Sequence, residues 1–107
     1  MKDWNFEAYE QDKFLLQVLS ILFERNKNLL YLLLDSNAPR LSTSPEIIKE
    51  ISMSLSSGED LLIRIGLDIW DGGTGGIHFN ELYQKLDGRN FKNILFILQY
   101  LYNNKIP

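Results

Sequence analysis

The glycine run at residues 71–76, Asp-Gly-Gly-Thr-Gly-Gly, is the feature that most restricts how this chain folds. Glycine loses more backbone freedom on folding than any other residue, so four of them in six positions interrupt regular structure. The segments on both sides carry apolar residues at helical spacing. The run therefore predicts a sharp loop between two helices. It leaves open whether the loop only turns the chain or also brings its backbone close to a partner.

Helical spacing of apolar residues continues along most of the chain. A polar stretch at residues 25–28 interrupts the first apolar segment and favours two helices over one. Ser44 before Pro45 and Ser57 before Asp60 are typical helix starts, and Asn80 is a third predicted cap. We predict an all-α fold, a compact orthogonal bundle of five to six helices, with the Gly-rich loop at 71–76 followed by a very short extended segment at 77–79. The predicted helices cover residues 14–34 (in one or two pieces), 45–55, 57–70, 80–86 and 91–103.

The length of 107 residues fits one domain, and we predict a single helical domain over residues 1–107. Residues 1–12 form an acidic, aromatic N-terminal arm that is expected to pack on it. The net charge of −3 argues against a protein that coats nucleic acid through bulk charge. The apolar stretch at residues 14–34 contains a charged run that is unfavourable in a bilayer. We therefore expect a cytoplasmic protein, without membrane contact, and its composition suggests a bacterial or phage one.

Few residue types that carry chemistry are present. The chain has no cysteine, and His78 is its one histidine, set between Ile77 and Phe79. Disulfides, thiol catalysis and zinc sites of the usual kind are therefore excluded. A lone histidine in an apolar alternation is typical of a surface or packing residue. We predict no enzyme, no cofactor and no metal.

Residues 70–81 resemble an EF-hand in their helix–loop–helix shape, but not in its ligands. Of the six positions that supply calcium ligands, only Thr74 and Glu81 offer side-chain oxygens. Asp68 and Asp71 are unusual in another way, because they lie in the last turn of a predicted helix, where the helix dipole favours cations. They form a possible cation site, and the alternative is that Arg64, a distant lysine or water neutralises them.

Residues 79–103 also fit a second class of protein, one that binds nucleic acid. They comprise a predicted helix, a turn at 87–90 and a longer helix, which is the order of a helix-turn-helix motif. Residues 79–107 carry four basic residues against two acidic ones. The longer helix is mostly apolar, which argues against this alternative. The candidate contacts are Arg89, Asn90, Lys92 and Asn93.

The last predicted helix carries more apolar residues than one core face needs. Its expected core face contains Phe91, Ile94, Leu95, Leu98, Leu101 and Tyr102. Phe96 and Tyr100 fall outside that face, and burying a Phe is worth roughly 2–3 kcal/mol. Either the aromatic residues of the N-terminal arm (Trp4, Phe6 and Tyr9) cover them, or another chain does.

Surplus aromatic surface favours a protein that acts through protein–protein contact. We expect a homodimer or a complex with another protein, with nucleic acid as the alternative partner. The predicted partner-binding residues are Phe96, Tyr100, Lys92 and Gln99 of the last helix and Gly73 and Thr74 of the glycine-rich loop.

Overall fold

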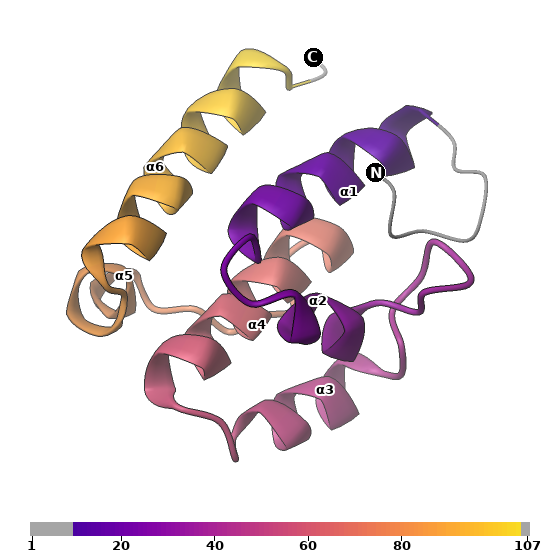
Figure 1. The fold of residues 1–107 in the computed structure, drawn as a ribbon, viewed down its shortest axis with the longest axis horizontal. Coiled ribbons are helices and arrows are strands. Elements are labelled where there is room, and N and C mark those ends of the chain that lie inside the picture. The colour runs from indigo at the N-terminus through magenta and orange to yellow at the C-terminus, as the bar shows by residue number, and fades with distance from the viewer. Residues whose placement is uncertain (1–9, 106–107) are drawn as a thin grey trace.

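The computed structural model describes residues 10–105. They form six α-helices, with one isolated antiparallel bridge between Leu34 and Leu41 (Figure 1). The all-α prediction is confirmed for this part of the chain. The helices are α1 (Glu10–Leu22), α2 (Lys27–Leu33), α3 (Pro45–Ser52), α4 (Ser57–Asp71), α5 (Phe79–Lys85) and α6 (Gly88–Asn103).

Helix α4 is the centre of the fold, because it packs against α1, α2, α3 and α5. Its buried side chains join those of α1 and α2 in one hydrophobic cluster. Gly66 lets the α1–α2 corner approach α4 closely, since a Cβ there would lie 2.7 Å from Leu33 Cδ2 and 3.1 Å from Phe23 Cζ. Helix α6 packs mainly on α1, so the first and last described helices lie side by side (Figure 1).

One break between helices and two helix starts follow the predicted signals, with small shifts. Residues 14–34 form two helices, and the break lies at residues 23–26, slightly before the predicted 25–28. Ser44 caps α3 as predicted, with Pro45 in the first helical position. The cap of α4 is Ser56 and not Ser57, because Ser56 and Glu59 satisfy each other's backbone N–H groups.

The predicted starts of the last two helices are wrong. Helix α5 begins at Phe79, and its N-cap is His78 and not Asn80. The Glu81 carboxylate accepts a hydrogen bond of 2.9 Å from the backbone N–H of His78, which fixes the start there. Helix α6 begins at Gly88, because Asp87 Oδ1 accepts the N–H of Asn90 at 2.8 Å. The predicted turn at 87–90 is therefore the N-cap and first turn of α6.

The predicted arm at residues 1–12 falls mostly outside the described residues, and its last three residues belong to the start of α1. Between residues 10 and 105, no helix combines the length and the apolar character that crossing a membrane requires.

Candidate functional site

A cluster of ion pairs lies beside the glycine-rich loop and joins α4 to α5. Arg64 donates to both carboxylate oxygens of Glu81, at 2.7 and 3.0 Å, and its Nε donates to Asp60 at 3.2 Å. Lys85 Nζ donates to Glu81 Oε2 at 2.7 Å. The side chains of Arg64 and Glu81 are only 14% and 10% exposed. The hydrogen bonds from Arg64, from the backbone of His78 and from Lys85 hold the pKa of Glu81 far below its ordinary value.

The loop itself uses its glycines for geometry. Gly75 is buried so closely that a Cβ would lie 2.0 Å from the carbonyl oxygen of Arg64. Its N–H donates to Asp68 Oδ1 at 2.6 Å, so the Asp68 side chain holds the loop backbone by a hydrogen bond. The composition of the loop thus follows from the sharp turn between α4 and α5. Positive φ angles, which favour glycine, occur at Gly72, Gly73 and Gly76.

The loop residues predicted to meet a partner are placed differently from one another. Gly73 is exposed, whereas Thr74 is half-buried, and its carbonyl accepts a hydrogen bond of 2.9 Å from Lys49. Thr74 Oγ1 is buried and makes no hydrogen bond within the described residues. Thr74 is thus held by a hydrogen bond from α3, whereas Gly73 lies on the surface.

The predicted cation site has two acidic side chains with different surroundings. Asp68 accepts the Gly75 N–H, while Asp71 is exposed at the end of α4. Arg64, which was the suggested counter-charge, is paired with Asp60 and Glu81 instead. In the described part of the chain, no three acidic or histidine side chains are grouped in a way that could hold a metal ion.

Helix α6 buries a face that overlaps only partly with the predicted one. Ile94 and Ile97 are buried, whereas Leu95, Leu98 and Tyr102 are 52%, 54% and 64% exposed. The expectation that these three belong to the core is therefore wrong. The reason is that α6 is apolar around most of its circumference, so spacing alone does not select the face that α1 covers.

The two aromatic residues predicted to bind a partner have separate environments. The Tyr100 ring packs against Phe14 of α1, with ring centroids 5.2 Å apart, and is half-buried. Phe96 meets the edge of Tyr100 at 6.2 Å and stays 57% exposed. Part of the cover on this flank therefore comes from α1. The predicted cover by residues 4–9 lies outside the described residues. Lys92 and Gln99 are exposed beside these rings.

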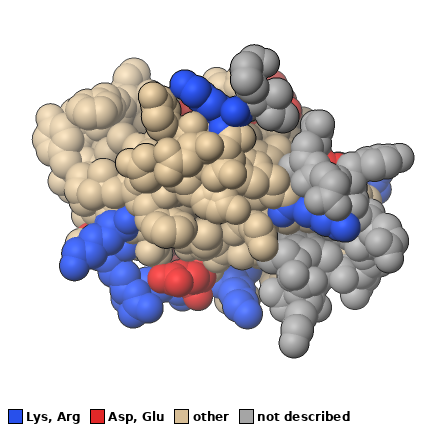
Figure 2. All heavy atoms as spheres, turned by 90° about the horizontal axis from the view of Figure 1, so that it is seen from above, with Lys and Arg blue, Asp and Glu red and all other residues tan. Residues whose placement is uncertain are grey.

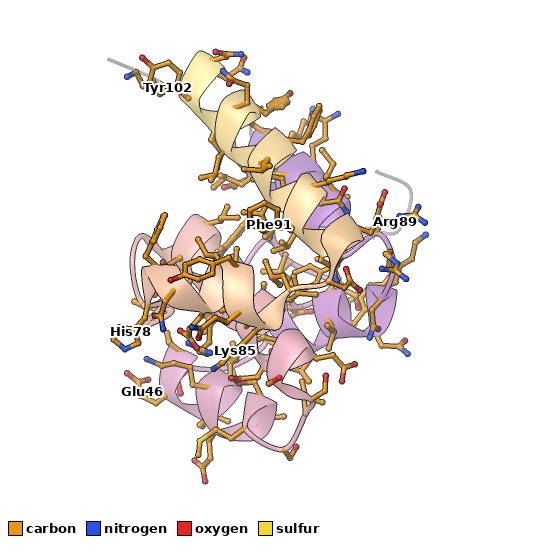
Figure 3. All side chains as sticks on the ribbon, turned by 90° about the vertical axis from the view of Figure 1, so that its left-hand side faces the viewer. Glu46, His78, Lys85, Arg89, Phe91 and Tyr102 are labelled. Atoms are coloured by element: carbon orange, nitrogen blue, oxygen red, sulfur yellow. The ribbon has the colours of Figure 1, made fainter. Side chains whose placement is uncertain are left out.

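A larger apolar surface lies on the other flank of α6, and the sequence analysis missed it. We call this surface, made of Phe79, Tyr83, Leu95, Leu98 and Tyr102, the α5–α6 face. All five side chains are more than half exposed, and Phe79 reaches 82%. In Figure 3, which looks onto this side, α5 and α6 lie nearest the viewer, with Tyr102 and Arg89 at opposite ends of α6.

A groove of about 330 Å3 runs between α4, α5 and α6 and makes the face continuous. Phe79 and Leu98 line it from opposite sides, and Asp68 is the one acidic residue at its wall. A second, shallower hollow along α6 contains Leu95, Leu98 and Tyr102. The floor of the groove is aliphatic: Ile65, Ile69, Ile77, Leu82, Ile94 and Leu101. The signal available in the sequence was the aromatic pair Phe79 and Tyr83, four residues apart on a short helix.

The candidate nucleic-acid contacts lie at the N-terminal end of α6, against the α1–α2 corner. Glu24 accepts a hydrogen bond from Asn93 at 3.0 Å and lies 3.6 Å from Arg89 Nε. Beside them, Arg25 pairs with Asp87 at 3.0 Å. Arg89 and Asn93 therefore make contacts inside the chain. Asn90 is half-buried and Lys92 is exposed. The helix-turn-helix interpretation stays a prediction.

Comparison of the chain with protein-family models, with curated proteins and with solved structures finds no match.

Proposed function

We propose that this protein is a bacterial cytoplasmic protein without catalytic activity, which acts through protein–protein contact at the α5–α6 face. The observation that carries the proposal is the exposure of three aromatic and two leucine side chains on one face, where Phe79 and Leu98 line an apolar groove. The three aromatic residues alone leave roughly 400 Å2 in water, taking about 200 Å2 for each whole side chain. This is about the size of the largest apolar patch on an ordinary monomer, and such a patch is often functional.

The distribution of charge supports the same interpretation. The residues that line the groove and the hollow include one acidic side chain, Asp68, and one basic side chain, Lys105. Figure 2, which looks onto the molecule from above Figure 1, also shows a broad area without Lys, Arg, Asp or Glu, with charged side chains at its edges. Depletion of charged residues is typical of the centre of a protein interface. The ionisable side chains of Arg64, Glu81 and Lys85 pair with one another, and Arg64 also donates to the carbonyl oxygen of Gly76 in the loop. This structural role explains why they are clustered, and it needs no catalytic role.

Photocrosslinking in cells that make the protein tests this proposal. Benzoylphenylalanine is incorporated at position 98, in the centre of the α5–α6 face. The matched control carries it at position 53, because Met53 is 78% exposed and directly follows α3, which lies on the other side of α4 from α6 (Figure 1). We expect protein adducts from position 98 and few from position 53. Equal or absent crosslinking at both positions would refute the proposal.

A further inference from the structure

We infer that the partner of the α5–α6 face is a second copy of this chain, and that the α6 helices of the two copies pack antiparallel about a two-fold axis. The inference rests on the proposed function and names the occupant of the same face. Its basis is the spacing, the charge and the area of the exposed residues of α6.

One stripe of apolar residues on α6 has the spacing of a coiled-coil seam. Its members, Phe91, Leu95, Leu98 and Tyr102, follow one another at intervals of four, three and four residues. Three of them are more than half exposed, and Phe91, at the N-terminal end of the stripe, is half-buried. This is the a/d repeat by which two helices interlock their side chains. The residues that α6 buries within its own chain, Ile94 and Ile97, lie outside this stripe. Helix α6 thus has one apolar face for its own core and a second one at the spacing that a partner helix uses.

An antiparallel register aligns the whole stripe with itself. When Leu95 of one copy faces Leu98 of the other, Phe91 faces Tyr102 at both ends of the contact. Each copy then contributes the same residues, as a two-fold axis requires. Phe79 and Tyr83, whose rings lie 6.4 Å apart next to the groove, extend the contact beyond the helix pair.

The charges of α6 favour the antiparallel over the parallel orientation. Arg89 and Lys92 lie near its N-terminal end, its first turn holds no acidic residue, and its last turn holds no basic one. Basic residues in this place are unfavourable for the helix dipole, and the N-cap Asp87 offsets them only in part. An antiparallel second copy places its C-terminal carbonyl groups beside Lys92. A parallel copy would instead bring the two Lys92 side chains together.

The available area meets the requirement of a dimer. The five side chains of the α5–α6 face expose about 500 Å2 per copy, which gives about 1,000 Å2 for two copies. That is the lower limit for a specific interface, so we expect a reversible dimer.

Sedimentation equilibrium of the purified chain tests whether a second copy covers the α5–α6 face. We expect a mass that rises with concentration from 12.5 kDa to twice that value. Leu98→Glu should weaken the dimer by about 100-fold or more, because the substitution occurs twice at the centre of the interface. Met53→Glu, the matched exposed control, should leave it unchanged. A chain that stays monomeric at several hundred micromolar overturns the inference, as does a dimer that tolerates Leu98→Glu while circular dichroism shows it folded.

Disulfide trapping tests the orientation, since the chain contains no native cysteine. Positions 91 and 102 lie about 16 Å apart along a helix axis. Mixing a Phe91→Cys protein with a Tyr102→Cys protein under mild oxidation should trap the mixed dimer in preference to either self-pair. Preferred self-pairs would indicate a parallel contact and overturn the antiparallel arrangement.

These results are distinguishable from those of the proposed function. Adducts from position 98 to a different protein, together with a monomeric purified chain, would overturn the dimer and leave the proposed function standing. Absence of any adduct from position 98 would remove both.

Discussion

Replacing Glu81 with glutamine tests how much the ion-pair cluster contributes to folding. The substitution keeps the shape of the side chain and removes the charge that Arg64 and Lys85 share. Breaking a buried ion pair costs about 3–5 kcal/mol, while exposed pairs contribute less than about 1 kcal/mol. Because Arg64 is mostly buried and Lys85 is 36% exposed, we expect a loss of about 2–3 kcal/mol.

The same substitution should change how stability depends on pH. The folded-state pKa of Glu81 is depressed from an ordinary value of 4.5, so its contribution is complete above pH 4.5 and is lost as the pH falls below it. The difference in unfolding free energy between wild type and Glu81→Gln should therefore be largest near pH 7 and shrink towards pH 3.

Urea unfolding followed by far-ultraviolet circular dichroism at pH 7, 5 and 3 measures this difference. The matched control is Glu50→Gln, an exposed acid on α3, which should change the free energy by less than about 0.5 kcal/mol. A difference for Glu81→Gln that is equally large at pH 7 and pH 3 would refute the reasoning, since it would show that charge is not what stabilises the cluster.

Three further substitutions test the loop, the core and a helix cap through the same unfolding measurement. Gly75→Ala should cost about 3 kcal/mol, because its Cβ would lie 2.0 Å from the Arg64 carbonyl oxygen; wild-type stability would contradict this. Gly66→Ala should cost about 1 kcal/mol, since overlap with Leu33 Cδ2 at 2.7 Å outweighs the gain in helix propensity, and a more stable variant would show that Leu33 yields. Ser56→Ala should cost about 1 kcal/mol through loss of the α4 cap, and an unchanged midpoint would argue against the cap.

Local patterns in the sequence predicted the class of fold because helix formation depends on neighbouring residues. The apolar spacing, the Ser44-Pro45 start and the glycine run each act within a few positions. The helix starts that were missed depended on competing caps. Ser56 caps α4 in place of its neighbour Ser57, and Asp87 caps α6 at a position where the sequence predicted only a turn.

The candidate site was harder to predict, since it depends on contacts between distant parts of the chain. Arg64 and Glu81 are 17 residues apart, and no local pattern pairs them. The face of α6 that meets α1 includes Tyr100, which packs against Phe14, whereas Leu98 stays exposed. The α5–α6 face therefore becomes visible only when the orientation of α6 is known, although every residue in it was known beforehand.

The packing of α6 on α1 has a consequence for how the protein is made in the cell. Among the described helices, α1 leaves the ribosome first, and α6, which covers its flank, leaves last. During synthesis the growing chain must therefore keep part of α1 uncovered until α6 emerges, an interval in which chaperones have access to it. Slow translation of the segment before α6 should lengthen that interval and increase aggregation of the newly made chain.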